Sequence, residues 1–198
     1  MTLPYPRAKV FPALASPVPA RCHLVLVTVL CGAALSACQG KDSGRPGGAA
    51  ASSIGQPAPV LAGKTIDGDP IALADLQGQV VLVNVWATWC KPCMRELPEL
   101  ATLHRNHAAQ GFTVLGVSVD KRQMLGKVRS MVTSYALEYP MLFDPESQAI
   151  DPWQISGYPT SVLVGRDGTI RWRRDGMIHP DDPELDQQIE AALAQPAS

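Results

Sequence analysis

Two cysteines separated by two residues carry the clearest chemistry in this 198-residue chain. Cys90 and Cys93 bracket a Lys-Pro dipeptide at the point where an apolar run gives way to a helical pattern. The unpaired N–H groups and the dipole of a helix N-terminus favour a thiolate over a thiol, so we expect Cys90 to be the nucleophile. Cys93, one helical turn further on, can then attack the mixed disulfide formed at Cys90. The pair therefore predicts thiol–disulfide exchange.

Hydrophobic patterning predicts the elements that must position this pair. A nearly continuous β-branched run indicates a buried strand over 80–86, helical spacing indicates a helix over 90–110, and a second apolar run indicates a strand over 112–119. Strand, helix and strand form a right-handed βαβ unit with parallel strands. Further helices are expected over 123–135 and 146–153 and from Asp182 onward, and further strands over 71–73, 141–143, 161–164 and 169–174. The order predicts an α/β thioredoxin-like fold, with a central mixed β-sheet and helices on both faces.

Residues 85–98, Val-Trp-Ala-Thr-Trp-Cys-Lys-Pro-Cys-Met-Arg-Glu-Leu-Pro, resemble the active-site segment of the thioredoxin superfamily. More narrowly they resemble its extracytoplasmic TlpA/ResA branch, and the resemblance covers roughly residues 54–198. It implies that Glu96 tunes the titration of the two cysteines. Taken alone, Glu96 would be a solvated charge in the first turns of a helix. Asn84 stands where cytoplasmic thioredoxin carries a buried aspartate, which leaves Glu96 more of the proton transfer.

A second segment, Gly157-Tyr158-Pro159-Thr160, stands where this superfamily places its cis-proline loop. The resemblance implies that Pro159 is cis and packs beside the cysteines. It also implies that the backbone of Tyr158 pairs with an extended substrate chain, while Trp89 shapes the rim of the site. Cis is a minority state for any X-Pro bond, so this expectation rests on the resemblance.

Residues 1–37 have the pattern of a signal peptide of lipoprotein type. Basic residues without acids precede an apolar run over 23–35, which is too short for a confident membrane span. The run closes with Leu-Ser-Ala-Cys, which resembles a bacterial lipobox and implies that Cys38 becomes the lipid-bearing first mature residue. An uncleaved anchor helix, or cleavage without lipid, stays open as an alternative. Gly, Ser and Ala dominate 38–53, which predicts a flexible tether ahead of a thioredoxin-like domain over 54–198.

The resemblance implies a function and partners. The implied function is that of a protein-disulfide reductase on the extracytoplasmic, periplasmic side of a membrane. The implied partners are exported proteins as disulfide substrates and an integral-membrane thiol reductant of the DsbD/CcdA type. Cytochrome c maturation is one task that members of the branch serve. No cofactor or metal is required. A net charge of −1 gives no basic field for nucleic acid.

Three rival functions remain open. A copper or other metal chaperone could use the cysteines with His179, although a structural zinc site needs about four ligands and the spacing is atypical for copper carriers. A peroxidase of peroxiredoxin type would share the entry segment from residue 54, but residues 83–90 offer Thr88 without the proline of the peroxidatic pattern. A thiol oxidase or isomerase would use the same pair, because the direction depends on its potential.

Overall fold

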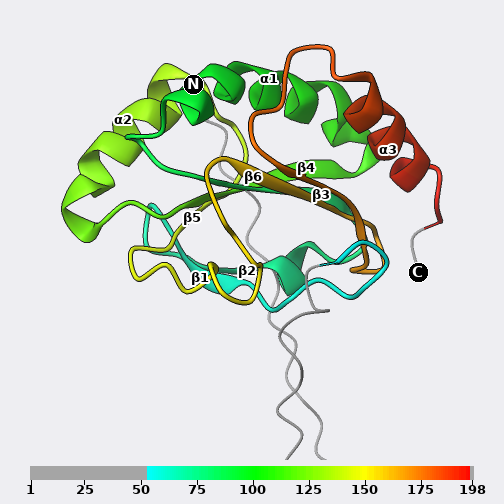
Figure 1. The fold of residues 1–198 in the computed structure, drawn as a ribbon, viewed down its shortest axis with the longest axis horizontal. Coiled ribbons are helices and arrows are strands. Elements are labelled where there is room, and N and C mark those ends of the chain that lie inside the picture. Colours follow the sequence, from blue (N-terminus) through cyan, green and yellow to red (C-terminus); the bar gives the residue numbers. More distant parts are fainter. Residues whose placement is uncertain (1–52, 197–198) are drawn as a thin grey trace, which may run out of the picture. The chain divides into compact units, whose positions relative to one another are not determined.

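The computed structural model describes residues 53–196, which form a seven-stranded sheet flanked by helices (Figure 1). The expected signal peptide and nearly all of the expected tether lie outside the described residues. The sheet has the order β2-β1-β5-β4-β3-β6-β7. Its strands are β1 (Ala62–Thr65), β2 (Pro70–Ala72), β3 (Val80–Trp86), β4 (Phe112–Ser118), β5 (Met141–Phe143), β6 (Thr160–Val164) and β7 (Ile170–Asp175). The helices are α1 (Lys91–His107), α2 (Leu125–Ser134) and α3 (Pro183–Leu193), with 3-10 turns η1 (Leu73–Leu76), η2 (Ala108–Gln110) and η3 (Arg122–Met124).

The middle of the sheet is the βαβ unit that the sequence predicts. β3 and β4 pair in parallel along their whole length, with Val80 opposite Phe112 and Trp86 opposite Ser118. Every residue of both strands is buried, as an apolar run covered on both faces requires. β6 pairs with β3 antiparallel, and β5 pairs with β4 in parallel. The predicted mixed sheet and thioredoxin-like fold are confirmed.

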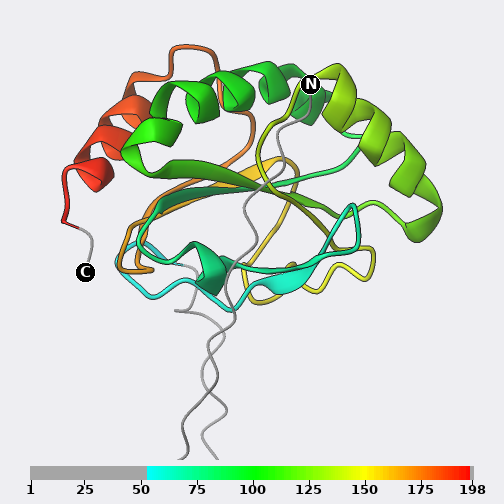
Figure 2. The same cartoon turned by 180° about the vertical axis from the view of Figure 1, so that it is seen from behind.

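The distribution of helices differs from the expectation of helices on both faces. Figures 1 and 2 show α1, α2 and α3 on one side of β3, β4 and β6. The steps from β3 to β4 and from β4 to β5 run in the same direction across the sheet, so two right-handed crossovers place α1 and α2 on the same face. The opposite side is covered by the β1–β2 ribbon, η1 and irregular chain.

The expected helix over 146–153 is wrong, because this segment consists of turns. The carboxylate of Asp144 accepts hydrogen bonds from the N–H groups of Gln148 and Ala149 and so fixes a local turn. Ser147 and Gln154 both have positive φ, which interrupts any helical path. Side-chain bonding to nearby backbone is a known competitor of helix formation.

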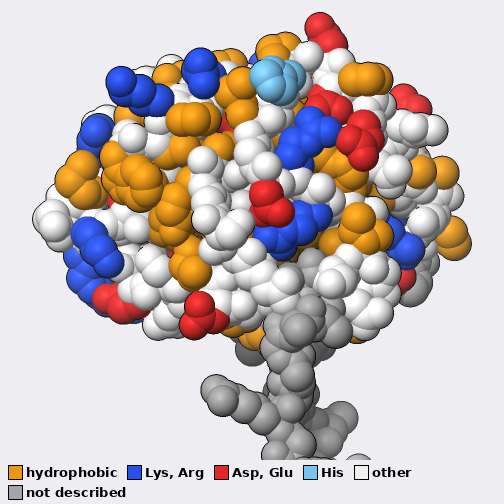
Figure 3. All heavy atoms as spheres, in the orientation of Figure 1, with side chains coloured by type: hydrophobic (Ala, Val, Ile, Leu, Met, Phe, Trp, Pro, Cys, Tyr) orange, Lys and Arg blue, Asp and Glu red, His pale blue; other side chains and the backbone are white. Residues whose placement is uncertain are grey.

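The outer surface of the helical layer has an uneven charge distribution. Figure 3 shows Lys and Arg side chains gathered over α2 and the adjoining end of α1, and Asp and Glu side chains over α3. No helix within residues 53–196 is long and apolar enough to cross a membrane.

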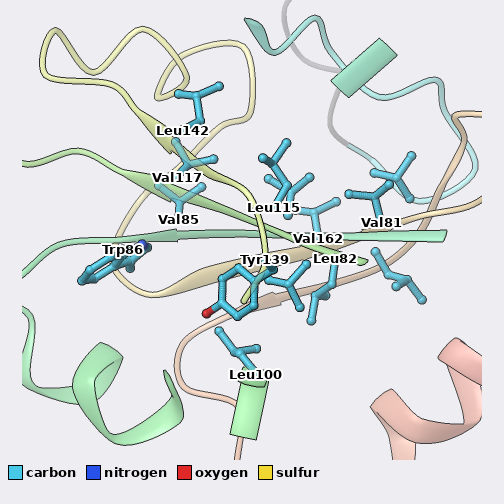
Figure 4. Packing of buried hydrophobic residues seen from close by; sticks show 14 of the residues in the cluster. Val81, Leu82, Val85, Trp86, Leu100, Leu115, Val117, Tyr139, Leu142 and Val162 are labelled. Atoms are coloured by element: carbon cyan, nitrogen blue, oxygen red, sulfur yellow. The ribbon is translucent and has the colours of Figure 1, made fainter. Parts of the chain in front are cut away.

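The apolar core lies on both faces of the sheet, one part of it between the sheet and this helical layer (Figure 4). Leu82 of β3 and Leu100 of α1 are fully buried on the helical side of the sheet, and Leu115 of β4 is fully buried on the opposite face. Burying a leucine side chain contributes about 2 kcal/mol relative to exposure, so this layer holds α1 firmly against β3 and β4. The start of α1 is thereby fixed beside the end of β3.

Candidate active site

The disulfide-bonded pair Cys90–Cys93 lies at the N-terminus of α1. Cys90 is the N-cap residue with extended backbone, and its Sγ accepts a hydrogen bond of 3.2 Å from the N–H of Cys93. Pro92 falls within the first helical turn, where no backbone donor is needed. Cys90 is 5% exposed and Cys93 is fully buried. Cys90 is therefore the more accessible residue of the pair, which agrees with its expected role as the nucleophile.

A buried carboxylate holds the loop that leads from β3 to Cys90. Asp120 accepts hydrogen bonds from the Thr88 N–H at 2.8 Å, the Thr88 hydroxyl at 2.7 Å and the Ser118 hydroxyl at 3.0 Å. Asp120 itself is fully buried. Three donors around one carboxylate satisfy the charge that burial would otherwise penalise. Sequence reasoning missed these hydrogen bonds to Asp120. The only signal for them in the sequence was an acidic residue directly after an apolar strand.

Trp89 and Tyr158 meet at the rim of the site. Their rings are perpendicular with centroids 5.5 Å apart, and the Trp89 side chain is 62% exposed. The Tyr158–Pro159 bond is cis, which confirms that expectation. Pro159 is buried and its carbonyl accepts a hydrogen bond of 2.8 Å from the N–H of Gly176. The structure thus brings two residues 69 positions apart in sequence into one aromatic edge beside Cys90.

Glu96 lies inside the protein, one turn beyond Cys93 on α1. It is fully buried, so the alternative of a solvated charge is wrong. Its Oε1 accepts from the amide Nδ2 of Asn84 at 2.8 Å, and its Oε2 accepts from the Ile178 N–H at 2.8 Å. Burial raises the pKa of Glu96 to about 7, and the two hydrogen bonds oppose that rise. A carboxyl group with this pKa can take up or release a proton near neutral pH.

Asn84 connects Glu96 to the neighbouring strand β6. Its Nδ2 also donates to the Ser161 hydroxyl at 2.9 Å, while its Oδ1 has no partner among the described residues. The hydroxyl of Tyr139 is buried and also unbonded within residues 53–196, and its pKa is raised by burial first and by the charge of Glu96 second. Sequence reasoning identified Asn84 and Glu96 but missed Ser161 and Ile178, which come from distant segments.

The metal-ligating side chains in the described part of the chain are not gathered into one site. Among residues 53–196 there is no group of three or more His, Cys, Asp or Glu side chains placed to hold a metal ion. His179 directly follows Ile178, whose N–H donates to Glu96. Its exposed side chain forms no such group with the cysteines.

Comparison with known proteins agrees with this geometry. The model of the AhpC/TSA family matches residues 54–173, which is more than half of the chain. The thiol-disulfide oxidoreductase ResA of Bacillus subtilis is 31% identical over 118 residues, which cover 60% of this chain and 65% of ResA. The chain thus spans slightly less than two thirds of ResA. The thioredoxin-like protein YneN of Bacillus subtilis is 35% identical over 69% of this chain and 78% of its own length.

Solved structures show the same architecture. A Chlorobium tepidum protein described as a thiol:disulfide interchange protein DsbE superposes with a TM-score of 0.66 and 32% identity, covering 72% of this chain and 99% of its own. A second Chlorobium tepidum protein of the thioredoxin family superposes with a TM-score of 0.60 and 28% identity over 72% of this chain and 99% of its own. The chain therefore belongs to the AhpC/TSA family, as a thioredoxin-fold member of its TlpA/ResA-like thiol-disulfide oxidoreductases.

Proposed function

We propose that this chain is an extracytoplasmic protein-disulfide reductase that works through Cys90 and Cys93. The observation that carries the proposal is the position of the pair. Cys90 caps α1 and keeps a small exposed fraction of 5%, and its disulfide partner Cys93 is fully buried. An arrangement of one accessible and one buried sulfur suits sequential attack and resolution.

The exchange proceeds in two displacements. The Cys90 thiolate attacks one sulfur of a substrate disulfide, so that a mixed disulfide forms and one substrate thiolate leaves. The Cys93 thiolate then attacks the Cys90 sulfur, forms the intramolecular disulfide and releases the second substrate thiolate. Two electrons pass from the cysteine pair to the substrate, and two protons follow. A thiol carrier of the DsbD/CcdA type in the membrane would return the pair to its dithiol form.

The surrounding residues support this chemistry in distinct ways. Glu96, with its pKa of about 7, takes the proton that Cys93 must lose before it can attack. Trp89 covers the approach to the Cys90 sulfur. The described residues offer no hydrogen-bond partner to the backbone of Tyr158, which leaves its N–H and C=O for an extended substrate segment. Pro159 fixes the path of that loop.

The location is proposed from the sequence outside the described residues. We expect residues 1–37 to be removed as a signal peptide, Cys38 to carry the lipid anchor, and residues 38–53 to tether the domain to the extracytoplasmic face of the membrane. Mass spectrometry of the Cys38 peptide tests the anchor. A peptide without a lipid mass increment would contradict it.

A trapping experiment tests the exchange itself. In full-length Cys93→Ser, attack by Cys90 still occurs but resolution cannot, so covalent adducts with disulfide peptides should accumulate on non-reducing gels. The matched control, Cys90→Ser with Cys93 intact, should give far fewer adducts, because Cys93 is buried. Equal adduct formation by both variants would refute the assigned order, and no adduct in either would refute the exchange mechanism.

The direction of electron flow follows from the potential of the pair. Equilibration with glutathione or dithiothreitol buffers should give a value near that of thioredoxin, about −270 mV, for a reductase that serves exported proteins such as cytochrome c precursors. A value near about −120 mV would instead assign a thiol oxidase.

A further inference from the structure

Three exposed cations without acidic partners among residues 53–196 lie on segments that carry or adjoin Cys90. Lys91 follows Cys90 directly, and Arg95 lies one turn further along the exposed side of α1. Lys121 comes from a different segment, but it adjoins the Asp120 that bonds Thr88. All three side chains are exposed, and none makes an ion pair or a side-chain hydrogen bond within residues 53–196. We call Lys91, Arg95 and Lys121 the cationic rim.

The acids near Lys121 do not neutralise the cationic rim. Asp120 and Asp144 are buried and bonded to local donors, and Glu146 pairs with Arg122 at 2.8 Å. Arg122 and Glu146 therefore cancel each other and leave the rim its net charge. Figure 3 shows the same asymmetry, with Lys and Arg over α2 and the adjoining end of α1 and with acids over α3.

The acid that follows the rim on α1, Glu99, lies near two acids from outside this helix and makes no ion pair within residues 53–196. Asp181 and Asp186 both raise the pKa of Glu99, after the larger effect of burial. Glu99 lies one turn beyond Arg95, so a boundary between positive and negative surface crosses α1 at that point.

The cationic rim adjoins an aromatic pair. Trp89 is the large aromatic side chain that stands most exposed at the site, and it rests edge-on against Tyr158. Exposed aromatics inside a polar border are typical of residues that anchor a protein partner. Unpaired charges at such a border mainly set the rate of association and the choice of partner.

We propose that the cationic rim selects protein disulfides flanked by acidic residues. The inference rests on the proposed disulfide exchange and specifies its substrate class. An acidic segment that enters beside Trp89 would place carboxylates near Arg95 and Lys121, while its disulfide meets Cys90. A basic segment would be repelled by the same field.

Three disulfide peptides of equal length test the proposal. Each carries the same cystine flanked by Glu, by Ser or by Lys, and each is mixed with the reduced full-length chain in a stopped-flow experiment. At low ionic strength the Glu peptide should react about tenfold faster than the Lys peptide. The ratio should approach one near 1 M salt, where the Debye length falls to about 3 Å.

Charge reversals locate the effect on the surface. Arg95→Glu and Lys121→Glu should each reduce the ratio of Glu-peptide to Lys-peptide rates severalfold. The matched control is Arg105→Glu, on the same helix and ten residues from Arg95, which is about 15 Å along the axis. Arg105 is exposed and, within residues 53–196, its side chain bonds only the Thr102 hydroxyl. The control should keep the wild-type ratio.

The outcomes separate this inference from the function on which it rests. If the Ser peptide is not reduced at all, the exchange function is wrong. If the Ser peptide is reduced but the Glu and Lys peptides react at nearly equal rates, the cationic rim does not select substrates. The same conclusion follows if Arg105→Glu lowers the ratio of Glu-peptide to Lys-peptide rates as much as Arg95→Glu does. An unchanged peptide ratio in Arg95→Glu together with weaker binding to phosphatidylglycerol vesicles would assign the rim to a membrane surface and overturn the proposal.

Discussion

Replacing Glu96 by Gln should make the stability of the protein less dependent on pH. Burial raises the pKa of this carboxyl from its ordinary value of 4.5 to about 7. A group whose pKa is higher in the folded state stabilises that state below the unfolded pKa and loses this contribution as pH rises through the folded pKa. Wild-type stability should therefore decline between pH 4.5 and pH 7, in addition to the effects of all other groups.

The size of this effect follows from the shift. A difference of about 2.5 pKa units corresponds to about 3 kcal/mol, which is lost almost completely between pH 4 and pH 8. Glutamine has nearly the same shape and does not titrate. Its oxygen can accept from the Ile178 N–H, and its NH₂ group can donate to the Asn84 Oδ1 if that amide turns over, since this oxygen is unbonded among the described residues.

Urea denaturation of the oxidised wild type and of Glu96→Gln at pH 4, 6 and 8 measures the difference. The free energy of unfolding of the variant minus that of the wild type should rise by about 3 kcal/mol from pH 4 to pH 8. Asp175→Asn is a suitable control, because hydrogen bonding by Arg173 lowers the pKa of Asp175 and gives the opposite sign of pH dependence. Parallel pH curves for wild type and Glu96→Gln would show that Glu96 has an ordinary pKa and would refute the argument from burial.

Two further predictions concern the elements that hold the site. Asp120→Ala should lower the free energy of unfolding by about 3 kcal/mol, because it leaves the buried Thr88 N–H and hydroxyl without their acceptor. Thr88→Val removes one of these two donors and should lower the free energy of unfolding less. If Asp120→Ala and wild type are equally stable in urea, the stabilising role of Asp120 is contradicted. Asp182→Ala should lower the free energy of unfolding by about 1 kcal/mol, because the Asp182 carboxylate accepts hydrogen bonds from the N–H groups of Glu184 and Leu185 at the start of α3. In thermal denaturation, Asp182→Asn should recover most of this lost stability. If it recovers none, the effect belongs to the ion pair with Arg174 instead.

Local patterning predicted most of the secondary structure for physical reasons. The runs over 80–86 and 112–119 lie within one residue of β3 and β4, because a strand buried on both faces must be apolar throughout. The last helix begins as expected with Asp182 as N-cap and Pro183 following it. The prediction of a helix over 146–153 was wrong, because the Asp144 carboxylate accepts hydrogen bonds from nearby N–H groups and these bonds compete with a helix. No periodicity in the sequence reveals such competition.

The sequence by itself determined the reactive pair. Cys90 and Cys93 need only their spacing and the start of a helix, which are local properties of the chain. The environment of Glu96 was decided by tertiary structure alone. Its burial and its bonds to Asn84 and Ile178 join segments 12 and 82 residues away, and no local pattern specifies that they meet. Desolvation depends on everything packed around a group, so the raised pKa of Glu96 exists only once the sheet, α1 and the loop before α3 have come together.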